Sequence, residues 1–232
     1  SATGYYYGSG QNYLGGIEEK KFGLALTWET ATKYNAGFDI GILDKFNLQF
    51  DAFKERREDI LLKRQKIPAF LGLVPHGTPY GNVGIVDNKG FDASIEFKNT
   101  TAYGLTYSLR GNFTFARNKI IEDDKAEPAE LYQRTKGTSL EQAFALVALG
   151  LFNDQEEIDN WAKSEYQTTI LPGDIKYQDT NGDGVINDKD RVFIGHPQIP
   201  EIMFGFGGAV VYKNIDASVQ FSGVANRTTF LT

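Results

Sequence analysis

The chain has 232 residues, a formal net charge of −6 at pH 7 and no cysteine. The acidic balance argues against nucleic acid as a partner, and the lack of cysteine excludes disulfides and thiolate metal sites. Phenylalanine, tyrosine and glycine number 17, 12 and 25, a composition typical of a β-rich protein. No run of about 18 apolar residues is present, so we expect no transmembrane helix.

Apolar and polar residues alternate along three successive pairs of segments, which predicts β-strands. The strands are predicted at 34–42, 46–62, 90–98, 105–115, 203–212 and 215–222. One face of each strand carries bulky aliphatic and aromatic side chains, and the other carries Asp, Glu, Arg, Asn and Gln. Each run has roughly the nine to eleven residues that a tilted strand needs to cross a bilayer. We therefore expect the apolar face to contact outer-membrane lipid and the polar face to line a lumen.

The connections between strands alternate in length. Short breaks at 43–45, 99–104 and 213–214 alternate with long connections at 61–89 and 117–202. Membrane barrels combine short periplasmic turns with long extracellular loops in this way. The predicted fold is all-β: antiparallel strands of a transmembrane β-barrel with long extracellular loops. A soluble antiparallel sandwich or barrel stays open as the alternative, because its strands alternate too.

The second long connection, 117–202, is predicted to be an extracellular insert with structure of its own. Residues 121–130 are acidic and are expected to form a solvated surface turn. The apolar segment 139–149 fits either a short helix or a buried strand. Asp154, three residues before Glu157, predicts the start of a helix over about 154–164.

Residues 179–190, inside the insert, have the pattern of a twelve-residue EF-hand-like calcium loop. Gly184 occupies position 6, where the chain must turn sharply. Five side-chain oxygens and one backbone carbonyl are expected to bind the ion, and the candidate ligands are Asp179, Asn181, Asp183, Val185, Asn187 and Asp190. The flanks read as extended chain, and position 12 holds the short carboxylate of Asp190. We expect a structural Ca²⁺ ion here; the alternative is an Asp/Asn/Gly turn that holds no metal.

Several stretches spread over almost the whole chain together resemble a known family. They include Trp-Glu-Thr-Ala at 28–31 before 34–39, Asn-Val-Gly-Ile-Val-Asp-Asn-Lys-Gly-Phe-Asp at 82–92, Gly-Leu-Phe at 150–152 before 155–158, Pro-Gly-Asp-Ile-Lys-Tyr-Gln-Asp at 172–179 before 181–184, Ile-Gly at 194–195 and Phe-Gly-Phe at 204–206. With these stretches the chain resembles the SusC/RagA class of TonB-dependent outer-membrane transporters of Bacteroidetes.

The resemblance implies that residues 1–232 are part of a TonB-dependent receptor β-barrel domain located in the bacterial outer membrane. The whole barrel would have about 22 strands around a plug, and this chain would supply six or seven of them. The resemblance also implies a SusD-like surface lipoprotein as partner and an oligosaccharide or a peptide as the imported ligand. Energy would come from the TonB complex, acting through an amino-terminal region that has no counterpart here.

Two other functions are alternatives to transport. An enzyme is not expected, because the chain has no H-E-x-x-H motif, no G-x-S-x-G motif and no P-loop. A soluble calcium-dependent β-rich binding or adhesion module would explain the calcium loop, but such modules use paired loops and this chain has one.

Overall fold

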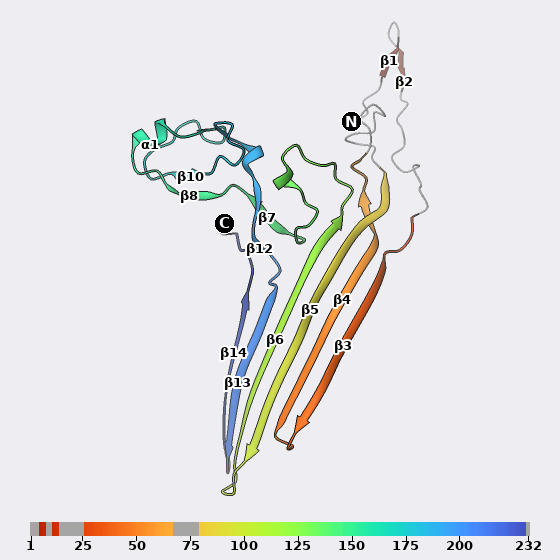
Figure 1. The fold of residues 1–232 in the computed structure, drawn as a ribbon, viewed down its shortest axis with the longest axis vertical. Coiled ribbons are helices and arrows are strands. Elements are labelled where there is room, and N and C mark those ends of the chain that lie inside the picture. The colour runs from red at the N-terminus through yellow and green to blue at the C-terminus, as the bar shows by residue number, and fades with distance from the viewer. Residues whose placement is uncertain (1–4, 8–10, 14–25, 67–78, 231–232) are drawn as a thin grey trace.

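A six-stranded antiparallel sheet dominates the computed structural model, which describes residues 5–7, 11–13, 26–66 and 79–230. The strand order is β14-β13-β6-β5-β4-β3. Its strands are β3 (Thr30–Ile42), β4 (Phe46–Lys63), β5 (Tyr80–Thr100), β6 (Leu105–Glu122), β13 (Ile202–Tyr212) and β14 (Ile215–Ala225). The strands lie side by side, with the hairpin turns at one end and the insert at the other (Figure 1). A separate hairpin is formed by β1 (Tyr5–Tyr7) and β2 (Gln11–Tyr13).

The predicted short turns are confirmed. In the β3–β4 turn the Lys45 amide donates to the Ile42 carbonyl at 3.1 Å. Leu43 and Asp44 between them both have φ of 53°, and this pair of left-handed residues gives a turn whose twist matches that of the flanking strands. In the β5–β6 turn, Gly104 has φ of 80°, a conformation that glycine adopts without a Cβ clash.

The strands extend further towards the insert than the sequence predicts. β5 begins at Tyr80 instead of near residue 90, and β6 continues to Glu122. Residues 80–89 contain two glycines and break the simple alternation, so they read as loop. Pairing with β4 nevertheless holds them in the sheet, with register shifts around Ile60. The connection after β4 is therefore 64–79, which lies partly outside the described residues, and the insert is 123–201.

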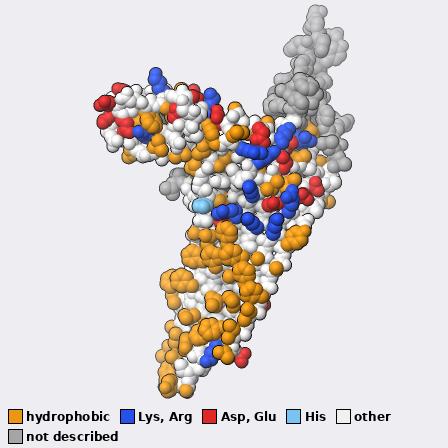
Figure 2. Space-filling view, viewed as in Figure 1, with side chains coloured by type: hydrophobic (Ala, Val, Ile, Leu, Met, Phe, Trp, Pro, Cys, Tyr) orange, Lys and Arg blue, Asp and Glu red, His pale blue; other side chains and the backbone are white. Residues whose placement is uncertain are grey.

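One face of the sheet is apolar from edge to edge. Residues directly opposite one another share a face, and one such row contains Phe38, Phe50, Ala93, Phe113 and Phe204. Phenylalanine rings stack between neighbouring strands, with centroids 5.5 Å apart for Phe38 and Phe50. Figure 2 shows the apolar side chains gathered over the lower part of the sheet, with Lys and Arg side chains above them.

This apolar face has no protein covering it among the described residues. The buried apolar residues are Ala143, Phe152 and Ile186, and all three belong to the insert. On the sheet, by contrast, Phe206 is 54% exposed and Ile95 is 51% exposed. In a soluble sandwich a second sheet would pack about 10 Å above such a face. The arrangement therefore does not fit the soluble alternative and suits a surface that meets lipid.

The insert consists of short elements rather than long helices. They are η2 (Leu131–Gln133), β7 (Gln142–Ala145), β8 (Ala148–Leu151), α1 (Gln155–Asp159), β9 (Lys163–Ser164), β10 (Ile175–Tyr177), β11 (Val185–Ile186), η3 (Asp188–Asp190) and β12 (Val192–Pro197). β7 pairs with β12 and β8 with β10, both antiparallel, whereas β9 and β11 run parallel. Of the two predictions for 139–149, the strand is confirmed and the helix is wrong, but the expected burial is confined to Ala143, since Leu149 is 51% exposed. No helix within the described ranges is long and apolar enough to cross a membrane.

Two details of the insert differ from the sequence prediction. The helix cap is confirmed, since Asp154 accepts the Glu157 amide at 2.8 Å, but α1 ends at Asp159 and does not reach 164. It ends early because Lys163 instead joins β9 to β11. The predicted solvated turn is wrong at Asp124, which is 5% exposed because Arg64 Nε binds its carboxylate at 2.8 Å.

Candidate functional site

The face opposite the apolar one is polar, and its side chains are bonded across strands. Ser94 Oγ lies 3.1 Å from Gln49 Oε1 on the neighbouring strand. Thr114 Oγ1 donates to Asp92 Oδ1 at 2.6 Å. These bonds fix polar groups at defined positions along the surface predicted to line the lumen.

Glycines in β13 open this polar face further. Arg110 on β6 reaches across β13 to Gln220 on β14, with Nε to Oε1 at 3.0 Å. A Cβ atom on Gly207 would lie 2.6 Å from the same Gln220 oxygen, so any larger residue would obstruct this bond. Beside Arg110 the face forms a shallow groove of about 570 Å³ whose lining includes Gln49, Ser94, Glu96, Arg110, Asn112 and Gln220.

At the two ends of the predicted calcium loop, aspartates hold its backbone in place. The Asp179 oxygens accept the amides of Gly182 and Gly184, each at 2.8 Å. Asp190 is fully buried, and its oxygens accept the amides of Thr180 at 2.8 Å and Asn187 at 2.9 Å. Together these four bonds tie the start, the middle and the end of the twelve-residue segment.

The other predicted ligands lie in the middle of the loop. Asn181 Oδ1 accepts the Asp183 amide at 3.0 Å, and Asp183 Oδ1 accepts the Val185 amide at 3.0 Å. Asn187 caps η3 through the Lys189 amide. The carbonyls on either side of Val185 accept hydrogen bonds from the amides of Lys163 in β9 and of Glu165 just after it, so alternation along the strand turns the Val185 carbonyl away from β9.

All six predicted ligands lie within one loop, but their side chains do not surround a common point. Within the described ranges, no group of three or more His, Cys, Asp or Glu side chains converges as a metal site. The donor set still suits Ca²⁺, because it consists entirely of oxygens. A carboxylate that accepts a backbone amide keeps further lone pairs for an ion, so the hydrogen bonds of Asp179 and Asp183 are compatible with metal binding.

Side chains from outside the loop hold its carboxyl-terminal end in place. Tyr132 Oη donates to the Lys189 carbonyl at 2.6 Å, and Gln133 Nε2 donates to the Asp188 carbonyl at 2.8 Å. From β9's side, Tyr166 Oη donates to Asp188 Oδ1 at 2.7 Å. Partial desolvation and the hydrogen bond to this carboxylate raise the pKa of Tyr166, which stays half-exposed, to about 12. The partners lie 22 to 57 residues apart, so no local pattern could have identified them.

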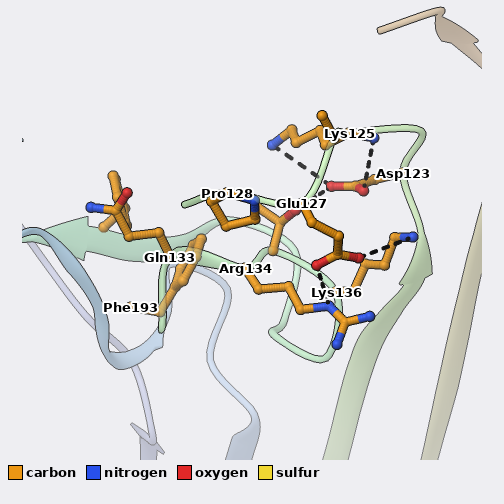
Figure 3. Close-up of a pocket in the computed structure, with 11 residues that line it drawn as sticks. Asp123, Lys125, Glu127, Pro128, Gln133, Arg134, Lys136 and Phe193 are labelled. Carbon is orange, nitrogen blue, oxygen red and sulfur yellow. Dashed lines mark hydrogen bonds and ion pairs between the residues drawn. The ribbon is translucent and has the colours of Figure 1, made fainter. Parts of the chain in front are cut away.

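At the base of the insert lies a cavity of about 370 Å³ (Figure 3). Its charged groups pair with each other: Arg134 Nε lies 3.2 Å from Glu127, and Lys125 Nζ lies 3.8 Å from Asp123. The rings of Phe144 and Phe193, with centroids 4.9 Å apart, contribute to the lining. Because these charges are neutralised in pairs, the cavity offers packing and hydrogen bonding rather than acid–base catalysis.

Comparison with known proteins identifies the family. Residues 1–222 match the family described as TonB dependent receptor-like, beta-barrel. TonB-dependent receptor P3 of Formosa agariphila is 28% identical over 209 residues, which cover 84% of this chain and 20% of that protein. TonB-dependent receptor SusC of Bacteroides thetaiotaomicron is 25% identical over 232 residues, which cover 97% of this chain and 22% of that protein. This chain thus spans about a fifth of the length of these relatives.

Solved structures of a transporter have a similar fold. The RagAB peptide importer in its closed-closed state superposes with a TM-score of 0.61 at 16% identity, covering 87% of this chain and 22% of that chain. In the open-open state the TM-score is 0.62, again at 16% identity, covering 87% and 21%. The matched relatives are receptors and transporters, not enzymes. This chain belongs to the TonB-dependent receptor β-barrel family, and its six long strands form a segment of an outer-membrane barrel wall, as the SusC/RagA resemblance implied.

Proposed function

We propose that the protein containing this wall segment is an outer-membrane import receptor of the SusC/RagA type that takes up oligosaccharides or peptides. The observation that carries the proposal is the division of one sheet into an uncovered apolar face and a hydrogen-bonded polar face. A wall of this kind separates lipid from an aqueous interior through which a polar solute can pass. The names of two relatives, SusC and the RagAB peptide importer, support nutrient import as the task.

Uptake by cells tests this proposal. A strain that expresses the full-length receptor is compared with a deletion strain for accumulation of a labelled maltooligosaccharide and of a labelled peptide. Accumulation of at least one solute should depend on the receptor. Arg110→Ala, which removes a charge from the polar face, should alter that uptake more than Lys213→Ala at a hairpin turn. Equal accumulation with and without the receptor would contradict the proposal.

The partners follow from the same proposal. A SusD-like lipoprotein would meet the outer ends of the strands, where the insert lies, and TonB would act from the periplasmic side. Affinity purification of the full-length receptor from outer membranes should recover a surface lipoprotein in near-equal amount. Uptake should stop when TonB is deleted, while surface expression stays the same. A receptor that purifies alone and imports without TonB would belong to a different transport class.

For the loop at 179–190 we propose structural Ca²⁺ binding. The ligands would be Asp179, Asn181, Asp183, the Val185 carbonyl, Asn187 and Asp190. The backbone bonds described above already fold the loop, so the ion would bind a preformed turn rather than order a random segment. The alternative is an Asp/Asn/Gly turn that needs no metal, and the same hydrogen bonds would stabilise it.

Calcium-dependent protection of the insert separates these alternatives. In the full-length receptor, 1 mM calcium should slow proteolytic cleavage of the insert relative to a chelator, and Asp179→Ala combined with Asp183→Ala should abolish that difference. Asp154→Ala, in the same insert but outside the loop, should leave the calcium effect intact. If calcium and chelator give the same cleavage rate in the unsubstituted receptor, the loop is a metal-free turn.

A further inference from the structure

Basic side chains follow directly after the apolar band on the lipid-facing side of the sheet. In the strand register, Lys54 lies opposite Lys89, and Lys89 lies opposite Arg117. All three are exposed and share the face of Phe91 and Phe115, two residues away along their strands. Figure 2 shows this gathering of Lys and Arg above the apolar region.

Such a row is unfavourable by itself, because like charges directly opposite one another repel across a β-ladder. Arg117 is neutralised by Glu201, with both bonds at 2.6 Å. Lys54, Lys89 and the nearby Lys119 form no ion pair within the described ranges; the carboxylate of Asp87, opposite Lys119 on this face, pairs with Arg56 at 3.7 Å. An anion outside the described protein would relieve this repulsion.

The height of the row identifies its surroundings. Two residues of a tilted strand correspond to about 5 Å along the membrane normal, for a rise of about 3.4 Å per residue and a tilt of about 40°. Lys89 therefore lies about 5 Å beyond Phe91, at the level of lipid headgroups and on the insert side of the barrel. At this level, lysine ammonium groups meet the phosphates of anionic lipids.

A groove of about 600 Å³ connects these lysines with the base of the insert, and its lining includes Lys54, Asp87, Lys89, Arg117, Lys119 and His196. The groove also contains a buried acceptor. Asp87 Oδ1 has no hydrogen-bond donor among the described residues, and its nearest cation, Arg56 Nη1, is 3.7 Å away. Oδ1 itself is shielded, but the Asp87 side chain as a whole is 28% exposed, and the part of the carboxylate that faces the groove can accept a hydrogen bond from a hydroxyl group on the ligand. Phosphates and hydroxyls together describe a phosphorylated sugar headgroup.

We infer that this groove binds the phosphorylated headgroup of an outer-leaflet glycolipid. Lys54, Lys89 and Lys119 contact the phosphate oxygens, and Asp87 accepts a hydrogen bond from a sugar hydroxyl. The acyl chains run down the apolar band past Phe91 and Phe115. The site goes beyond solute import, because it lies on the face opposite to the lumen and needs only the membrane location of the wall.

Lipid binding to the full-length receptor tests the site. Receptor in detergent micelles is titrated with lipid A that carries two phosphates, and the apparent Kd is obtained by native mass spectrometry. The test variant is Lys54→Gln, Lys89→Gln and Lys119→Gln together. Its matched control, Lys45→Gln, Lys98→Gln and Lys213→Gln, removes the same charge at the hairpin end of the strands. A third variant with arginine at 54, 89 and 119 retains the charge.

The test variant should bind about a hundred-fold more weakly, since each basic residue beside an anionic headgroup contributes about fivefold. The control and arginine variants should stay within about threefold of the unsubstituted receptor, and dephosphorylated lipid A should bind as weakly as the test variant does. Equal affinity of the test and control variants would overturn the site. If 10 mM inorganic phosphate displaces the lipid and binds equally in its place, the groove is a soluble-anion site and the glycolipid assignment is wrong.

Discussion

Replacing Ile95 by arginine tests whether the apolar face meets lipid. Leu105 and Phe115 both point outward and are ten residue steps apart on β6, which is about 26 Å along the membrane normal at a tilt of about 40°. This matches the apolar band of about 25 Å on outer-membrane barrels. Gly111, directly opposite Ile95, lies near the middle of that span. Ile95 is thus close to the bilayer midplane.

The two possible surroundings predict different costs. At the midplane an arginine on the lipid face costs about 2–4 kcal/mol. On a water-facing surface, a side chain that is already 51% exposed would tolerate the change within about 0.5 kcal/mol. Ser94→Arg is the matched control, because it makes the neighbouring residue of β5 basic on the polar face.

Guanidinium unfolding of the full-length receptor in lipid vesicles measures both variants. Ile95→Arg should lower the unfolding free energy by about 2–4 kcal/mol, and Ser94→Arg should lower it by less than about 1 kcal/mol. Equal and small effects of the two substitutions would refute the assignment of the apolar face to lipid.

Two further predictions concern the insert. Glu201→Ala should lower the free energy of unfolding by about 1–2 kcal/mol, because it removes two charge-assisted bonds from Arg117, a half-exposed cation that water can partly resolvate. Proteolysis at the base of the insert should become faster. Unchanged cleavage would contradict the role given to this pair. The pKa of Glu157 is lowered from 4.5 to about 2 by the Asn153 amide and by Lys176, so its stabilising contribution is present above about pH 4.5 and is lost as the pH falls through about 2. Between pH 6 and pH 2, the loss of stability of the insert should be smaller in the Glu157→Gln variant, whereas Glu156→Gln on the same helix should leave it unchanged. An equal loss of stability in both variants would contradict this pH linkage.

The sheet was predictable from sequence because lipid and lumen impose alternation on every strand. In β5, apolar residues alternate with polar ones, as in Phe91, Ala93 and Ile95 between Asp92, Ser94 and Glu96. This alternation allows one strand register that keeps the apolar residues on one face. The hairpin turns were predictable for the same reason, since alternation stops at each. The alternation of apolar and polar residues ends where β5 leaves the apolar band. For this reason the sequence predicts a start near residue 90 and misses the first part of β5, which begins at Tyr80.

The insert was less predictable because distant pairs determine its shape. Asp124, which follows β6, looks like part of an acidic surface turn until Arg64, which follows β4 on the other side of β5, binds it. Likewise, the pattern at 179–190 indicates a loop in which Asp179 accepts backbone amides, but the hydrogen bond from Tyr132 depends on a contact across the insert. The two short strands at 142–151 form only because β12 and β10 provide partners.

The most direct test of the barrel-wall account is the accessibility of successive positions along β5. Single cysteines introduced at positions 91 to 96 of a cysteine-free full-length receptor are spin-labelled in vesicles, and collisions with oxygen and with a water-soluble nickel complex are measured. Labels at 91, 93 and 95 should collide mainly with oxygen from the lipid, and labels at 92, 94 and 96 should favour the nickel complex. Accessibility without a period of two, or water contact at 91, 93 and 95, would contradict the account.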